Sequence, residues 1–131
     1  MTPENIGEVA MYFFTFRDQM KIYHFQTTSY ARHIAIDQFV NLLTVQLDTY
    51  LENLQGTSGM KMVIPSHMSE IGLLNMDEKN SVDILHVFKN WVLNDLPRLS
   101  NNFEKNYKDL QNVQEDILSN INKTLYLFRL N

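Results

Sequence analysis

Apolar residues recur at intervals of three and four along the first part of the chain, which is the spacing of one face of an α-helix. Between residues 4 and 26 this set consists of Ile6, Val9, Phe13, Phe16, Met20 and Tyr23. Before it, Thr2 is a capping residue type, Pro3 suits the first helical position, and Glu4 complements the positive helix end. The pattern therefore predicts a first helix over residues 4–26.

A second helix is predicted after a short run of hydroxyl residues at 27–29. Thr and Ser favour helix caps, so Thr28 or Ser29 is expected to begin a helix that runs to about Gln55 and stops at Gly56. Steps of 100° per residue place an apolar set on one half of this helix: Ile36, Phe39, Val40, Leu42, Leu43, Leu47, Tyr50 and Leu54. A polar stripe lies on the other half: His33, Asp37, Asn41, Thr44, Asp48 and Glu52.

The remainder of the chain predicts two more helices and one long connection. Residues 56–77 contain three of the four glycines and Pro65, which predicts an irregular connection with one helical turn near 66–70. A third helix is expected from Asp77 or Asn80 until Pro97 ends or kinks it, and a fourth over residues 109–130. A connection this long can cross a bundle from end to end. We therefore predict a single all-α domain over residues 1–131: a ferritin-like four-helix bundle with a long crossover between its second and third helices.

Composition narrows the classes of function. The chain has 131 residues and no cysteine, so disulfides and thiolate metal sites are excluded. Its formal net charge of −4 disfavours DNA binding, because nucleic-acid surfaces are basic. No apolar run reaches the roughly 18 residues of a membrane span. The absence of a secretory signal at the start predicts a cytoplasmic location, or a particle assembled there.

The polar stripe of the second helix is the candidate site. His33 and Asp37 are four residues apart, as are Asp48 and Glu52, so each pair shares a helix face. Carboxylates and imidazoles on one face are the ligands with which helical bundles bind iron or manganese. The same residue types also occur on ordinary solvated helix faces. Spacing alone leaves both readings open.

The stretch that begins at His24-Phe25 resembles the signature of the mini-ferritins, the Dps family. The corresponding residues here are His24, His33, Asp37, Asp48 and Glu52. The resemblance implies that these five residues bind iron at a two-fold interface of a homo-oligomer, with the histidines from one subunit and the carboxylates from its mate. It also implies a ferroxidase activity.

Two features depart from that signature. Phe25 stands where the family has Trp, and His24 and His33 are nine residues apart where the family has twelve. In one straight helix, nine residues would place the two imidazoles on opposite sides. A break at residues 27–29 would allow them to converge.

The segments YHFQTTSYARHIAIDQF, LENLQG and NKTLYLFRL are similar to an uncharacterised ferritin-like family of tailed phages and large DNA viruses. This resemblance implies the same fold. It adds an alternative function, in which the chain is a non-enzymatic structural or interaction component of a virus particle.

Several further residues are assigned ordinary structural roles. Asp83 and His86 have the spacing of half a di-iron motif, but no second copy occurs, so an exposed pair is expected. Arg32 is expected at the surface, and Trp91 in the core or an interface. The chain contains no Ser or Cys nucleophile pattern, P-loop or dinucleotide fingerprint.

Overall fold

The computed structural model describes residues 1–130. Its helices are α1 (Pro3–Gln26), α2 (Tyr30–Ser58), a 3₁₀ turn η1 (Ser66–Met68), α3 (Glu78–Asn90), a π-helical segment η2 (Trp91–Asp95), α4 (Leu96–Ser100) and α5 (Lys108–Phe128). Residues 1–130 contain no β-strand, which confirms the predicted all-α class. Because α3, η2 and α4 follow one another without a gap, they form one rod, and residues 1–130 form four rods in all.

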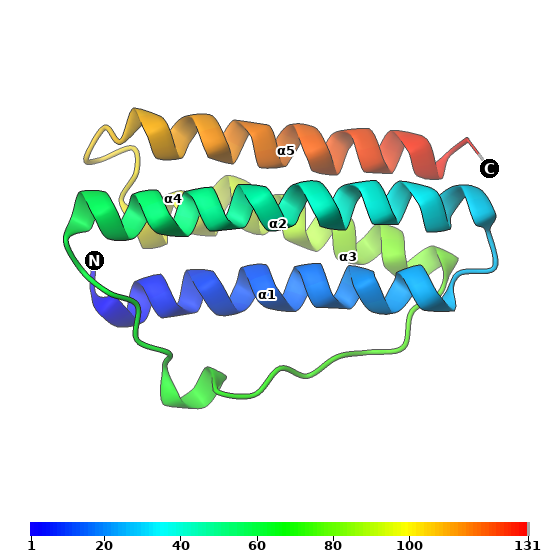
Figure 1. The fold of residues 1–131 in the computed structure, drawn as a ribbon, viewed down its shortest axis with the longest axis horizontal. Coiled ribbons are helices and arrows are strands. Elements are labelled where there is room, and N and C mark those ends of the chain that lie inside the picture. The colour runs from blue at the N-terminus through cyan, green and yellow to red at the C-terminus, as the bar shows by residue number, and fades with distance from the viewer. Residues whose placement is uncertain (131) are drawn as a thin grey trace.

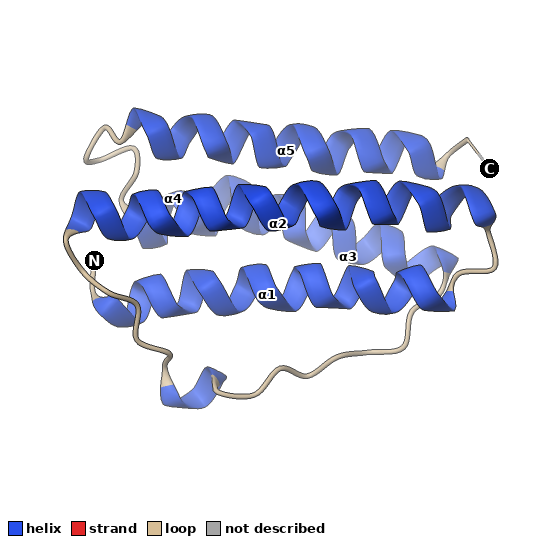
Figure 2. Ribbon diagram, viewed as in Figure 1, coloured by secondary structure: helices blue, strands red, loops and turns tan. Residues whose placement is uncertain are grey.

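The rods lie side by side, and one connection spans their full length (Figure 1). Helices α1 and α2 are antiparallel, and residues 59–77 then return along α1 to the opposite end of the bundle. Helix α3 therefore runs parallel to α2, and α5 returns antiparallel to both. Except for η1, residues 59–77 are loop (Figure 2). The predicted long crossover is thus present.

The core lies between the four rods and is built from the apolar positions that the spacing predicted. Its largest fully buried members are Phe13, Tyr23, Phe39, Tyr50, Phe88 and Phe128. Trp91 is also buried, as expected for a core residue. Leu42 is an exception, because 48% of its surface is exposed. It lies at the edge of the apolar half of α2 and is not part of the core.

The ends of α1 and α2 follow from their capping residues. The Thr2 hydroxyl accepts from Asn5 N–H at the start of α1, and Ser29 caps α2 by accepting from Arg32 N–H. Between them the backbone is extended at Thr27, so the predicted break is present. The predicted stop at Gly56 is wrong: α2 continues to Ser58 and ends at Gly59. Gly59 has a φ of 72°, a left-handed conformation that glycine adopts without steric cost.

The crossover is attached to α1 at both ends. Near its start, Val63 N–H donates to Pro3 O at 3.0 Å. This close approach depends on Gly7, because a Cβ there would lie 1.9 Å from Val63 O. Near its end, the Gln19 side chain donates to Leu74 O at 2.7 Å and accepts from Leu74 N–H at 2.8 Å. The loop is therefore held against the outer side of α1.

Pro97 was expected either to end the third helix or to kink it. The third rod does not end there. It continues to Ser100, and Asn101 then adopts a left-handed conformation with a φ of 51°. In η2 the hydrogen bonds shift by one residue, so Leu96 N–H donates to Trp91 O. Pro97 has no N–H to donate, and Val92 O accepts instead from the Gln114 side chain at 3.1 Å. This contact with α5 satisfies a carbonyl that proline would otherwise leave unpaired.

Candidate functional site

His24 and His33 meet at the turn between α1 and α2. Their rings stack with centroids 3.8 Å apart and an interplanar angle of 21°. His24 is near the last turn of α1 and His33 is in the first turn of α2, so the extended residues between the helices bring the rings together. The break at residues 27–29 therefore removes the opposite-sides geometry that a single straight helix would impose.

Two reciprocal hydrogen bonds fix the orientation of these rings. His24 Nδ1 lies 3.1 Å from His33 O, and His33 Nδ1 lies 2.8 Å from His24 O. A carbonyl oxygen can only accept, so each Nδ1 carries the proton and each neutral ring has its lone pair on Nε2. Neither Nε2 has a hydrogen-bond partner within residues 1–130. Neither is among the buried polar atoms that lack a partner there, so both nitrogens are accessible. Each Nε2 can therefore bind a metal ion.

The three predicted carboxylates lie further along α2, away from the imidazoles. Asp37 Oδ1 is 3.7 Å from Lys21 Nζ, and both side chains are almost half exposed. Asp48 and Glu52 are exposed, and no ion pair joins either of them to another residue in the range 1–130. Within that range of one chain, no group of three or more His, Asp or Glu is arranged to hold a metal ion. One copy therefore brings the two histidines together and leaves the carboxylates apart from them.

Arg32 was expected at the surface. It is instead buried, with an exposed fraction of 8%, at the end of the bundle that carries the histidine pair. Its Nη1 donates to Tyr23 Oη at 2.9 Å, Glu78 O at 2.9 Å and Ser81 Oγ at 3.3 Å, and its Nη2 donates to Phe128 O at 3.2 Å. The surface prediction was wrong because Arg32 falls within the apolar sector of α2. One side chain thereby joins all four rods.

Glu78 completes this cluster at the start of α3. Its carboxylate accepts from the Tyr23 hydroxyl at 2.8 Å and the Thr27 hydroxyl at 2.9 Å. Desolvation by burial raises the pKa of Glu78, but the hydrogen bonds from Tyr23, Thr27 and the Thr28 backbone, with the charge of Arg32, lower it below its ordinary value. Sequence analysis did not identify this cluster, which holds the residues around the histidine turn.

A second buried polar cluster occupies the opposite end of the bundle. The Tyr50 hydroxyl donates to Ser100 Oγ at 2.9 Å and accepts from Asn102 Nδ2 at 3.0 Å. Asn102 Nδ2 also donates to Gln114 Oε1 at 2.9 Å. Burial raises the pKa of Tyr50 to about 12, although the bonds to Ser100 and Asn102 lower it in part. This cluster is enclosed by the core, and its role is structural.

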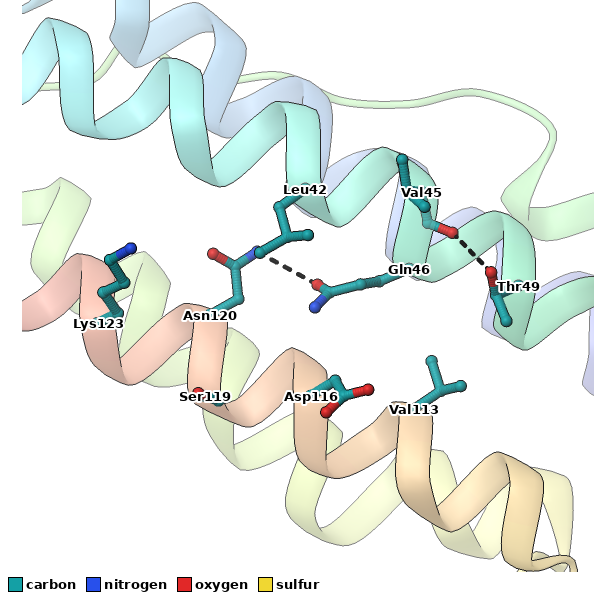
Figure 3. A pocket seen from close by; sticks show the side chains of 9 residues that line it. All are labelled: Leu42, Val45, Gln46, Thr49, Val113, Asp116, Ser119, Asn120 and Lys123. Atoms are coloured by element: carbon teal, nitrogen blue, oxygen red, sulfur yellow. Dashed lines mark hydrogen bonds between the residues drawn. The ribbon is translucent and has the colours of Figure 1, made fainter.

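A surface groove with a volume of about 510 Å³ lies between α2 and α5 (Figure 3). Asn120 donates to Gln46 Oε1 at 3.2 Å across its base, while Leu42, Val45 and Val113 form its apolar part. None of the five predicted site residues lines it. On α3, Asp83 and His86 are both exposed and no hydrogen bond joins them to each other, which fits the expected surface pair.

Within residues 1–130, no helix combines the length and the apolar character that crossing a membrane requires. A family model described as "Family of unknown function (DUF5856)" matches residues 24–128, from the first histidine of the pair to the end of α5. The chain belongs to this family. Searches of curated proteins and of solved structures gave no significant match.

Proposed function

We propose that two copies of this chain bind iron between them, and that iron is a substrate which they oxidise. His24 and His33 of one copy would supply nitrogen ligands, and Asp48 and Glu52 of the other would supply oxygen ligands. Asp37, one helical turn from His33, would supply its oxygen from the same copy as the histidines. The observation that carries the proposal is the convergence of the two imidazoles, each with its Nδ1–H fixed to a carbonyl. Such a second bond orients a metal-binding histidine and leaves Nε2 for the ion.

The separation of the ligands within one chain supports a site shared by two copies. His33 lies at the start of α2 and Glu52 near its end, and their midpoint falls between Leu42 and Leu43. An antiparallel α2 from a second copy, centred on that midpoint, would place each His33 beside the partner's acidic end. A two-fold axis would form two such sites at once, because it relates every contact to its reciprocal.

Exposed apolar side chains on α2 support the same arrangement. Ile34 is 40% exposed and Val45 62% exposed. With steps of 100° per residue, both fall within about 60° of Asp48 and Glu52 around the helix. A second copy on this face would cover these apolar groups together with the site.

The order of the rods supports a ferritin-like bundle for the fold. Such bundles have four helices with one long crossover, and they build iron sites from carboxylates and histidines on facing helices. The Asp37–Lys21 pair, at 3.7 Å and partly exposed, is weak enough to exchange for a metal ion.

Iron binding by the purified protein tests the proposal. Protein is incubated with ferrous iron without oxygen, desalted, and analysed for bound iron and for mass in solution. The wild type should retain iron as a dimer or a larger oligomer, and an Asp48→Ala/Glu52→Ala variant should lose it. A matched Asp83→Ala/Asp116→Ala variant, which removes two exposed carboxylates outside the site, should retain it. Equal and low iron in the wild type and the first variant would refute the site.

The proposed oxidation has its own readout. Adding hydrogen peroxide to the loaded wild type should produce the ultraviolet absorbance of ferric iron faster than in buffer. The Asp48→Ala/Glu52→Ala variant should show only the buffer rate. If the wild type binds iron and its oxidation rate equals that of buffer, the protein binds iron without ferroxidase activity.

A second candidate is a non-enzymatic structural or interaction role on the same fold, such as a component of a virus particle. The exposed Ile34 and Val45 and the engagement of Asp37 by Lys21 favour it, because an interface needs no metal. A His24→Gln/His33→Gln variant discriminates between the two functions. Under this second function the oligomer persists in the variant, and the wild type binds no iron.

A further inference from the structure

A pocket of about 390 Å³ opens between α3 and α5, at the end of the bundle where Arg32 is buried. One part of its lining is apolar and consists of Val82, Leu125 and Phe128. The other part is polar and consists of Arg32, His86, Asn122 and Arg129. No Asp or Glu is among the lining residues, so the pocket concentrates positive charge in a chain whose net charge is negative.

The buried charge of Arg32 has no direct counter-ion among residues 1–130, because no carboxylate there lies within ion-pair distance of its guanidinium. Its Nη1 donates to the main-chain oxygen of Glu78, and the Glu78 carboxylate is connected to it through the Tyr23 hydroxyl. Charged side chains that are this buried are normally paired, because removing an ion from water is costly. The guanidinium is partly compensated by the Phe128 ring, whose centroid is 4.6 Å from Cζ. An anion in the pocket would supply the missing opposite charge.

The donors that remain on Arg32 suit such an anion. Its Nε–H has no acceptor among the described residues, and Nη2 has one acceptor, Phe128 O, for its two hydrogens. These two nitrogens form one edge of the guanidinium, to which carboxylates and phosphates bind through parallel hydrogen bonds. Nε is buried in this packing, so direct contact with a ligand requires neighbouring side chains to move.

Arg129 provides a second, accessible guanidinium at the same pocket. It is exposed, and its Cζ lies 5.8 Å from the ring centroid of Tyr126. The exposed His86 and Asn122 add side-chain donors from α3 and α5. Two guanidiniums beside an apolar wall match a ligand that has an anionic head and an apolar body.

We propose that this pocket binds a small organic anion, with a carboxylate or phosphate head held by Arg129 and Arg32 and a short apolar body against Val82 and Leu125. Neither His24 nor His33 lines this pocket, and the proposal does not depend on iron binding.

Titration of the isotopically labelled full chain, followed by amide NMR, tests the proposal. The probes are hexanoate and hexyl phosphate, with hexanol as the uncharged control. Both anions should produce saturable shifts at residues 82–86 and 122–129, and hexanol should not. Arg129→Gln should weaken hexanoate binding about tenfold, the usual effect of one charged contact. Arg98→Gln, which removes an exposed arginine of α4 outside this pocket, should leave it unchanged.

Three results would overturn the assignment. The first is the absence of saturable shifts at these residues up to the solubility limit of the probes. The second is an equal response to hexanol, which would show only adventitious apolar contact. The third is equal weakening by Arg129→Gln and Arg98→Gln, which would show only general attraction to surface cations. Because both substitutions are at exposed residues, the variants should fold, and unchanged amide spectra without probe will verify this.

Discussion

The same substitution, Gly→Ala, is expected to change the free energy of unfolding in opposite directions at Gly7 and at Gly56. Both glycines lie inside helices, where replacement by Ala gains about 1 kcal/mol of helix propensity. A Cβ at Gly56 would meet no atom within 4 Å. Gly56→Ala should therefore stabilise the fold by about 0.5–1 kcal/mol.

At Gly7 the steric cost exceeds this gain. The added Cβ would lie 1.9 Å from Val63 O and 2.6 Å from Val63 C, and real Cβ atoms essentially never approach closer than 3.0 Å. The crossover backbone must therefore move by about 1 Å, which costs about 1–3 kcal/mol for overpacking. The movement also breaks the bond from Val63 N–H to Pro3 O, at a cost of about 1 kcal/mol. Subtracting the propensity gain leaves a net destabilisation of about 1–3 kcal/mol.

Urea unfolding and thermal unfolding, both followed by circular dichroism, measure the two effects as changes in the free energy of unfolding and in Tm. At about 4 °C per kcal/mol for a chain of this size, Gly7→Ala should lower Tm by about 4–12 °C and Gly56→Ala should raise it slightly. The two variants have the same composition, so their difference isolates the packing of the crossover on α1. If Gly7→Ala is as stable as Gly56→Ala, the crossover does not lie against α1 as described.

Three further predictions concern the buried polar groups. Tyr50 has a pKa raised to about 12 from 10.0, so the folded state retains its proton longer than the unfolded state, and its contribution to stability should fall by about 1.4 kcal/mol per unit between pH 10 and 12. When the free energy of unfolding is measured in urea and plotted against pH over that range, it should fall less steeply for Tyr50→Phe than for the wild type. Arg32→Met should lower the free energy of unfolding by about 3 kcal/mol in the same assay, because it leaves buried acceptors without a donor. The control Arg98→Met, at the surface, should change it by less than about 0.5 kcal/mol. Gln114→Leu leaves Val92 O without a donor and should cost about 1–3 kcal/mol, with hydrogen exchange accelerated at residues 91–97 if that bond secures the π-helical segment.

The helices were predictable because their signals are local. Apolar spacing identified four helical stretches, and Thr2 and Ser29 were recognisable caps. Gly56 and Gly59 are three residues apart, and only the backbone conformation shows that the second one ends α2. The continuation past Pro97 was not predictable from the third helix alone, because it involves Gln114 from α5.

Only part of the geometry of the candidate site could be predicted from the sequence. Ring convergence depends on how three residues turn between two helices, a detail that sequence spacing leaves open. The sequence does contain a signal for the burial of Arg32. This residue falls in the middle of the apolar sector of α2, between Phe39 and Leu43 on the helical wheel, and a charged residue there indicates a buried role. Its partners Tyr23 and Glu78 come from other rods, and only the fold reveals them.

The crossover also has a kinetic consequence. Helices α1 and α2 are joined through residues 27–29, so they can pair as a local hairpin with little loss of chain entropy. Helix α3 can join them only after residues 59–77 have been drawn along the whole bundle. Contacts between distant parts of a sequence form more slowly than local ones. We expect the α1–α2 hairpin, with its histidine pair, to form before the loop is fastened at Gly7, so substitutions at Gly7 should speed unfolding more than they slow folding.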